Sequence, residues 1–314
     1  MKRSASDVIR RGFDSTLANW QLIVIRVVES FAGGAVLIAS IVAIIVPIVA
    51  SAGISDWNVR PNTDPRQAVL DLIVSHMTLI FYVIGVIVLV FGVLIAIHAF
   101  VTAGCAAVFV DAERRAGAAP PAARDAYRAF TTERFFAAAR DAWWRTFWLY
   151  NATWSVGALI LLVPIIPVLF GTIAFSQREN VPGAIATGCG GIALILLVAI
   201  PVAFVISIWT EKAVILCAGY GVPLRTALRD SWRLVRADFG RHAGVAFIMM
   251  VIMFGMSMLL SGFLAPFTFG TPHTPFGFSW FGPQIMVSVV QNAVTNGVGC
   301  WFIACFAAMT EEPR

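Results

Sequence analysis

The side chains that could do chemistry in this chain are polar groups set in apolar sequence, and the largest set lies near the C-terminus. There, amide and hydroxyl residues recur at helical spacing: Gln284, Ser288, Gln291, Asn292, Thr295 and Asn296. A helix brings such residues onto one face. Inside a bilayer, that face must meet protein or water. The stripe therefore either hydrogen-bonds to a neighbouring helix or lines a polar pathway for a lipid headgroup or small solute.

Two histidines and one charged pair also fall in apolar sequence. His98 and His242 lie on two different predicted helices, an arrangement that a bis-histidine haem would need. Because two histidines often fall at such positions by chance, we assign no cofactor. Arg26 and Glu29 are three residues apart on one helix, which favours an ion pair over a proton relay.

Basic and aromatic residues alternate at helical spacing in three segments: Ser6 to Trp20, Ala122 to Trp144 and Pro223 to Phe239. We expect each to form an amphipathic helix in the membrane interface, with its arginines reaching lipid phosphates. The predicted lipid-binding arginines are Arg128, Arg134, Arg140 and Arg145 in the second segment and Arg225, Arg229, Arg233 and Arg236 in the third. The alternative is that these helices only anchor and space the segments that follow.

Enzymatic and metal-binding motifs are missing from the sequence. It contains no Walker motif, HExxH, GxSxG or paired catalytic carboxylates, so we predict that the chain is not an enzyme. Its cysteines show no CxxC spacing, which supports neither a zinc site nor a disulfide framework. We expect them to be small buried residues in or beside helices: Cys105, Cys189, Cys217, Cys300 and Cys305.

Composition indicates an integral membrane protein. Hydrophobic residues make up 59% and charged residues 12% of 314 residues, and the mean hydropathy is +0.85. A bilayer-spanning helix needs about 20 apolar residues. Six stretches qualify: Ser30 to Ala52, Met77 to Val101, Phe147 to Gly171, Ala184 to Trp209, Gly244 to Pro266, and Ile285 to Ala308.

These stretches predict an all-α polytopic fold of three hairpins, each preceded by an interfacial helix. The whole chain, 1–314, would be one membrane domain with pseudo-repeats 1–110, 111–210 and 211–314. Arg140-Asp-Ala-Trp143 and Arg229-Asp-Ser-Trp232 are the clearest trace of that repetition. Sequence compatible with helix continues from Gln67 to Val110, roughly 65 Å, so we expect this helix to project from the membrane or to break near Gly92 or Gly104.

Charge predicts the orientation in the membrane. Seventeen Lys and Arg residues precede or separate the hairpins, whereas only Arg60, Arg66 and Arg178 fall on the other side. The positive-inside rule then places both termini in the cytoplasm, and we expect a bacterial inner membrane. Because anionic lipid accounts for the basic pI near 9.2, a nucleic-acid partner is not needed.

The outer segment from Leu264 to Pro283 is aromatic, rich in Gly and Pro, and free of charge. We expect it to lie on the outer leaflet or to dock against another protein. Its aromatic residues are Phe267, Phe269, Phe276, Phe278, Trp280 and Phe281.

Two short stretches resemble a known family. The run from Trp232 to Phe239, Trp-Arg-Leu-Val-Arg-Ala-Asp-Phe, is similar to the Trp-Arg-Leu-Val-Arg-x-Asn-Phe segment of a six-helix prokaryotic family, the membrane domain of glycerophosphoryl diester phosphodiesterase. Ala106 to Arg115 is similar to that family's Leu-Tyr-x-Asp-Leu-Arg-x-Arg ending. Asp238 stands where the family often has Asn. The resemblance implies the fold and not the activity, because a catalytic barrel needs about 250 further residues.

Two functions fit these features. The first is a non-enzymatic membrane scaffold or accessory subunit that binds lipid and a partner membrane protein through the arginine helices and the aromatic outer segment. The second is a transporter or lipid-handling protein with a cavity that reaches Asn292. A closed bundle would suit only the first.

Overall fold

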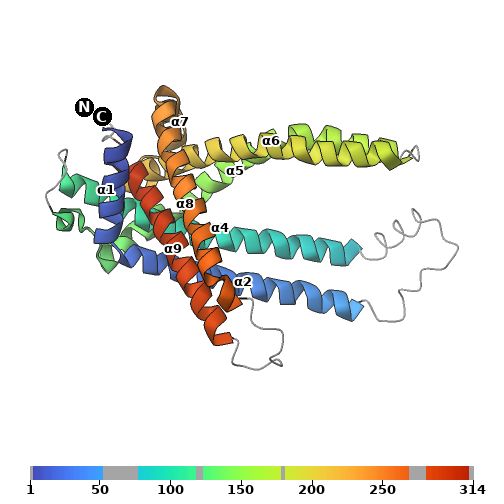
Figure 1. Cartoon of the computed structure of the whole chain (residues 1–314), viewed down its shortest axis with the longest axis horizontal. Coiled ribbons are helices and arrows are strands. Elements are labelled where there is room, and N and C mark those ends of the chain that lie inside the picture. Colours follow the sequence, from blue (N-terminus) through green and yellow to red (C-terminus); the bar gives the residue numbers. More distant parts are fainter. Residues whose placement is uncertain (1–2, 52–76, 118–122, 178–180, 269–280, 311–314) are drawn as a thin grey trace. The chain divides into compact units, whose positions relative to one another are not determined.

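The computed structural model describes residues 3–51, 77–117, 123–177, 181–268 and 281–310, and within these ranges the regular elements are all helical. Figure 1 shows the long helices α2 (Gln21–Ser51), α4 (Met77–Ala116), α5 (Thr132–Gln177), α6 (Val181–Val214), α8 (Phe239–Thr268) and α9 (Phe281–Ala308). Six helices are long and apolar enough to cross a membrane, so the chain has the features of a multi-pass membrane protein. The shorter elements are α1 (Ala5–Ala18), α7 (Leu224–Ala237), the 3₁₀ turn η1 (Arg124–Tyr127) and the π-helical turn η2 (Ile215–Gly219).

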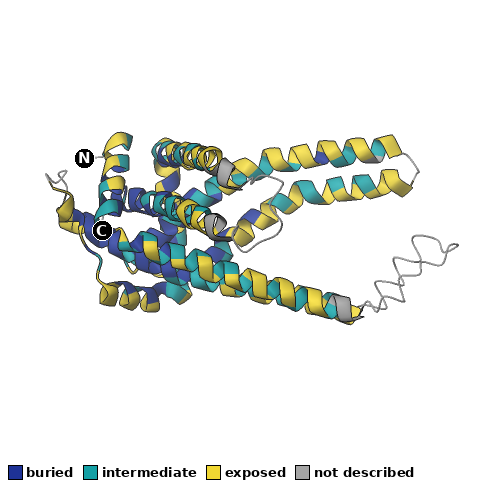
Figure 2. Cartoon of the chain, turned by 60° about the horizontal axis from the view of Figure 1, so that its bottom comes forward, coloured by how far each residue is buried: buried dark blue, intermediate teal, exposed yellow. Residues whose placement is uncertain are grey.

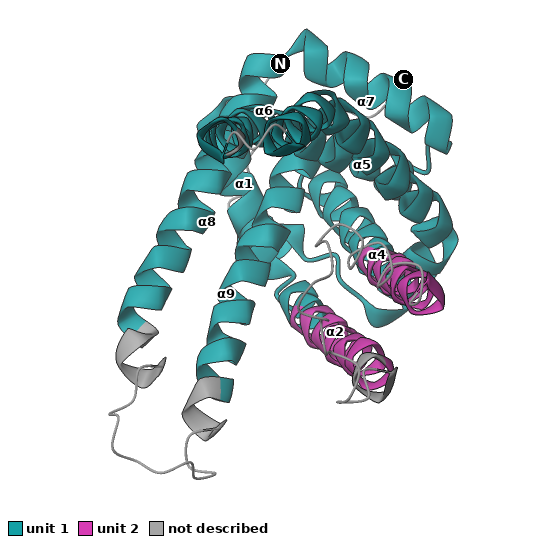
Figure 3. Ribbon diagram, turned by 90° about the vertical axis from the view of Figure 1, so that its right-hand side faces the viewer, with its two compact units in different colours: residues 1–26, 99–314 teal, residues 27–98 magenta. Residues whose placement is uncertain are grey.

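The chain divides into two compact units, which are coloured separately in Figure 3. Unit 2, Val27–His98, contains most of α2 and the first half of α4. The two helices run antiparallel within it, since Nδ1 of His98 lies 2.7 Å from Oε1 of Glu29 and the Tyr82 hydroxyl donates to the Ala43 carbonyl at 3.1 Å. The carboxylate of Glu29 therefore pairs with a histidine of the facing helix.

Unit 1, residues 1–26 and 99–314, holds the core. Its largest buried side chains include Phe109 in the last half of α4, Phe135 and Leu149 in the first 18 residues of α5, Ile215 in η2 and Phe306 near the end of α9. Figure 2 shows that the buried residues gather in these parts of the helices, whereas the remaining lengths of the long helices are mostly exposed. Those exposed residues are large and apolar, as lipid-facing surfaces require.

Helix α1 buries its polar side rather than its apolar side. Arg11 is 3% exposed, and its guanidinium donates to Oε2 of Glu113 and to the carbonyl of Gly117, which ends α4 with φ +69°. Asn19 is fully buried and accepts from the backbone N–H groups of Ala129 and Phe130. These bonds join the N-terminal helix to chain segments more than 100 residues away.

Helix α4 runs unbroken through Gly92 and Gly104, with its last half in the core of unit 1. The expected break is therefore absent, and the alternative, a helix long enough to project from the membrane, fits its 40 residues. One local prediction is wrong. The second basic segment is not a separate helix: after η1, α5 begins at Thr132, capped by the Thr131 hydroxyl, and continues into the apolar stretch as one helix of 46 residues. No strong helix breaker separates the two parts.

Candidate functional site

Helix α7 presents a buried face and an exposed, basic face. Small or branched residues at every fourth position are buried against the rest of unit 1: Ala227, Ser231 and Val235. The arginines at positions 225, 229 and 233 follow the same four-residue spacing on an adjoining, exposed face. The rigid α-helical spacing therefore presents three guanidinium groups in one row.

One side-chain hydrogen bond fixes α7 against the end of α6. The indole Nε1 of Trp209 donates to the carbonyl oxygen of Leu228 at 3.0 Å. The rings of Trp209 and Trp232 also pack with centroids 5.5 Å apart at 61°. Together, the hydrogen bond and the ring contact hold the row of arginines beside α6.

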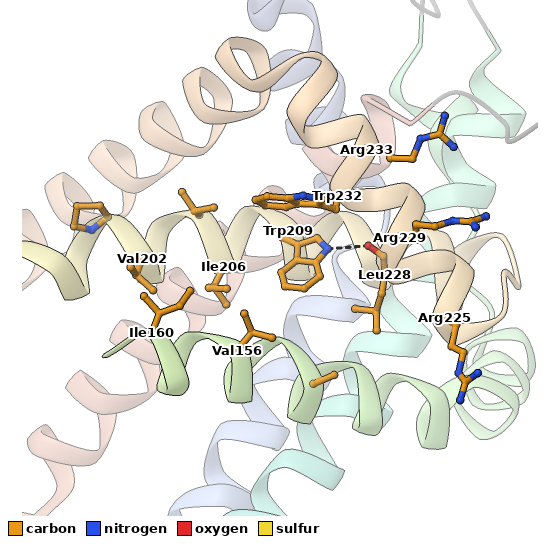
Figure 4. Close-up of a pocket in the computed structure, with 13 residues that line it drawn as sticks. Val156, Ile160, Val202, Ile206, Trp209, Arg225, Leu228, Arg229, Trp232 and Arg233 are labelled. Carbon is orange, nitrogen blue, oxygen red and sulfur yellow. Dashed lines mark hydrogen bonds between the residues drawn. The ribbon is translucent and has the colours of Figure 1, made fainter. Parts of the chain in front are cut away.

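An apolar groove of about 820 Å³ lies between α5, α6 and α7. Its volume is within the range of small-molecule sites. Its walls come from Ala152, Val156 and Ile160 of α5 and from Pro201, Val202, Val205, Ile206 and Trp209 of α6. Helix α7 closes one end with Arg225, Leu228, Arg229, Trp232 and Arg233. In Figure 4 the three guanidinium groups point away from the aliphatic walls, with the two indoles between.

The arginine end of the groove is strongly positive. The carboxylate close to the arginines is that of Asp230, whose Oδ1 lies 3.4 Å from Nε of Arg229 and 3.9 Å from Nη1 of Arg233. All three side chains are well exposed, so such pairs contribute little to stability and are readily exchanged. The guanidinium groups are therefore able to bind a phosphate, for which their planar fork is well suited.

Aromatic residues on α5 mark the depth of the groove. Trp144 packs against Trp148 with ring centroids 5.7 Å apart, and both indoles are about half exposed. Tryptophans of this kind concentrate at membrane–water interfaces. The groove residues Ala152 to Ile160 follow Trp148 by roughly 6 to 18 Å along the helix, so the groove runs from the level of the tryptophans into the apolar part of α5.

The other predicted lipid-binding arginines lie outside the groove. Arg134 pairs with Asp111, and Arg145 donates to the Gly221 and Asp141 carbonyls at 3.3 and 3.4 Å. Arg128, Arg140 and Arg236 are exposed but do not line the groove. Of the eight predicted arginines, the groove brings together only Arg225, Arg229 and Arg233.

The polar stripe of α9 lies apart from the groove. Ser288, Gln291 and Thr295 are exposed. Asn292 and Asn296 are half-buried, and each donates to the carbonyl four residues earlier in α9 at 2.9 Å. Gln284 belongs to α9, but its side chain lies outside the described residues.

The remaining predicted sites are only partly described. Of the aromatic outer segment, Phe269, Phe276, Phe278 and Trp280 lie outside the described residues, and α8 and α9 include the backbones of Phe267 and Phe281. The His242 Nδ1 lies 2.9 Å from the Asp238 carbonyl oxygen, and His98 pairs with Glu29. Four of the cysteines are buried as expected, whereas Cys189 is exposed. No three potential metal-binding side chains cluster among the described residues.

Sequence reasoning found the arginines of the groove but missed its walls. The wall residues Val156 and Ile206 resemble any other apolar residue of a membrane span. Trp209, at the end of its apolar stretch and followed by Glu211 and Lys212, was the available signal for an interfacial position.

Comparisons with protein-family models, with curated proteins and with solved structures find no match for this chain. The resemblance to the phosphodiesterase membrane domain therefore remains a prediction.

Proposed function

We propose that this chain is a non-enzymatic scaffold or accessory subunit of the bacterial inner membrane, and that it binds an anionic phospholipid in the groove between α5, α6 and α7. The observation that carries the proposal is the junction of aliphatic walls with a row of three arginines. A lipid acyl chain would pack against the aliphatic walls, and the lipid phosphate would bind the arginines.

The proposed membrane placement follows from the charges. Helices α1 and α7 and the first turns of α5 would lie at the cytoplasmic surface, each leading into a hairpin of two spans, with both termini cytoplasmic. The exposed apolar residues Phe13 of α1 and Trp20 just after it would then face lipid, while Arg11 and Asn19 face protein. A partner membrane protein would contact the aromatic outer segment.

A transporter with a cavity lined by α9 remains the alternative. It requires a cavity that reaches Asn292, whereas the groove described above is formed by α5, α6 and α7. The exposure of Ser288, Gln291 and Thr295 favours an outward-facing stripe over a pathway within the bundle.

Lipid titration of the purified chain tests the proposal. Native mass spectrometry would compare the binding of phosphatidylglycerol and phosphatidylcholine to the wild type and to the variant R225Q/R229Q/R233Q. At about 1 kcal/mol per charge, the triple change should weaken phosphatidylglycerol binding roughly a hundredfold. Phosphatidylcholine binding should start weaker and change less.

The matched control is R128Q/R140Q/R236Q, which removes the same charge from exposed positions outside the groove. This variant should keep most of the wild-type affinity. Equal losses in the two triple variants would show that lipid responds to overall charge and that the groove is not a site.

A further inference from the structure

The outer half of α9 has an exposed polar face where other spans expose apolar residues. On α8, the exposed side chains include Met258, Leu259 and Phe263, as lipid contact predicts. On α9, Ser288, Gln291 and Thr295 are exposed along one face, beside exposed apolar residues such as Met286 and Val290. These polar residues lie roughly 5 to 15 Å along the helix from Ile285, where the span begins, and so within hydrocarbon.

The Gln291 carboxamide is the most costly of these groups to expose to lipid. It makes no hydrogen bond within the part of the chain that the structure describes. The hydroxyls of Ser288 and Thr295 could return to their own helix backbone, but a glutamine side chain has two N–H donors and an oxygen to satisfy. A polar group without a partner in hydrocarbon is strongly unfavourable, so this face requires a hydrogen-bonding partner.

We propose that the partner is the same face of a second copy, so that two α9 helices associate through this stripe. Amides and hydroxyls carry donors and acceptors together, which makes the stripe complementary to itself. Two copies inserted in the same direction are related by a two-fold axis along the membrane normal. Their α9 helices are then parallel, and equivalent residues meet at the same depth.

A glycine on the same face of α9 allows a second helix to approach closely. Gly299 follows Thr295 by four residues, and a Cβ added to Gly299 would meet nothing within 4 Å. The pair forms a small-xxx-small pattern, which lets two membrane helices approach closely enough for polar side chains to bond. The inference does not depend on lipid binding in the groove, which uses other helices.

Disulfide formation between copies tests the interface in native membranes. The background is C189S, because the other four cysteines are buried. Cysteine at Ser288 or Thr295 should give covalent dimers on mild oxidation, whereas cysteine at Met286, on another side of α9, should not. Equal crosslinking at all three positions would overturn the proposal.

Single-molecule photobleaching in dilute liposomes measures the association without crosslinking. The wild type should bleach mainly in two steps. The Q291L/N292L variant should shift the equilibrium toward single steps by about tenfold, while V289L/V290L should not. A wild type that bleaches in one step would contradict the proposal, as would a Q291L/N292L variant that dimerises like the wild type.

Discussion

At the scale of single residues, buried charge decides where the N-terminal helix lies. Neighbouring arginines of α1 have opposite environments: the side chain of Arg10 is 82% exposed, whereas that of Arg11 is buried and lies 2.9 Å from the Glu113 carboxylate. Arg3 reaches the same carboxylate and the carbonyl of Ala308, the last residue of α9. One glutamate at the end of α4 therefore connects three helices.

Replacing Arg11 with methionine should destabilise the fold. The change leaves the buried Glu113 with Arg3 as its remaining basic partner and removes the closest donor to the Gly117 carbonyl, which should cost about 1–3 kcal/mol. R10Q, one residue away, should stay within about 0.5 kcal/mol of the wild type because exposed charges contribute little. Unfolding midpoints in detergent, followed by tryptophan fluorescence, measure both variants. Similar midpoints for R11M and R10Q would contradict this assignment.

At the scale of elements, the backbones of α1 and α9 lie close together, and this contact fixes the position of α1 on α9. A Cβ added to Gly12 would lie 2.9 Å from the backbone nitrogen of Cys305, too near for any side chain. The indole of Trp301 donates to the Ile9 carbonyl at 2.8 Å and extends the same contact. A short helix with a polar, buried face is thereby fixed to the last membrane span.

G12V should therefore lower stability by about 1–3 kcal/mol through overpacking. The matched control is G240A in α8, where an added Cβ meets nothing within 4 Å and alanine favours the helix. The same fluorescence midpoints separate the two changes. An unchanged midpoint for G12V would mean that α1 does not lie this close to α9.

The elements differ in how far sequence could predict them. Within the described residues, all six apolar stretches lie on long helices, because a run of about twenty apolar residues strongly favours a membrane-spanning helix. Local spacing predicted an amphipathic helix for the first basic segment, but it did not predict that Arg11 and the C-cap residue Asn19 would be buried against protein. Their partners, Glu113 and the backbone near Tyr127, are about 100 residues distant, and no local pattern indicates them.

The groove shows the same limit. Local spacing placed Arg225, Arg229 and Arg233 on one face of a helix. Its walls depend on the way α5 and α6 meet, and a run of aliphatic residues does not specify which side faces which neighbour. Long-range packing therefore had to come from the structure.

At the scale of the whole molecule, the charge asymmetry predicts six spans with both ends in the cytoplasm. Single cysteines introduced at Asn62 or Gln177 in the C189S background should react with an impermeant maleimide in intact cells. A cysteine at Arg128 should react only after the membrane is permeabilised. The reverse pattern would invert the topology and place the groove in the outer leaflet.

The central claim is that the groove binds an anionic phospholipid specifically, beyond the transient contacts that any exposed surface makes with bilayer lipids. Photo-crosslinking in membranes tests this claim most directly. A benzophenone amino acid is placed at Val202, which lines the groove. The control position is Leu197, which is 70% exposed on the same helix and does not line the groove. After detergent washing and illumination, Val202 should crosslink phosphatidylglycerol and lose that product in R225Q/R229Q/R233Q, whereas Leu197 should retain little lipid. Equal, arginine-independent crosslinking at both positions would contradict the account.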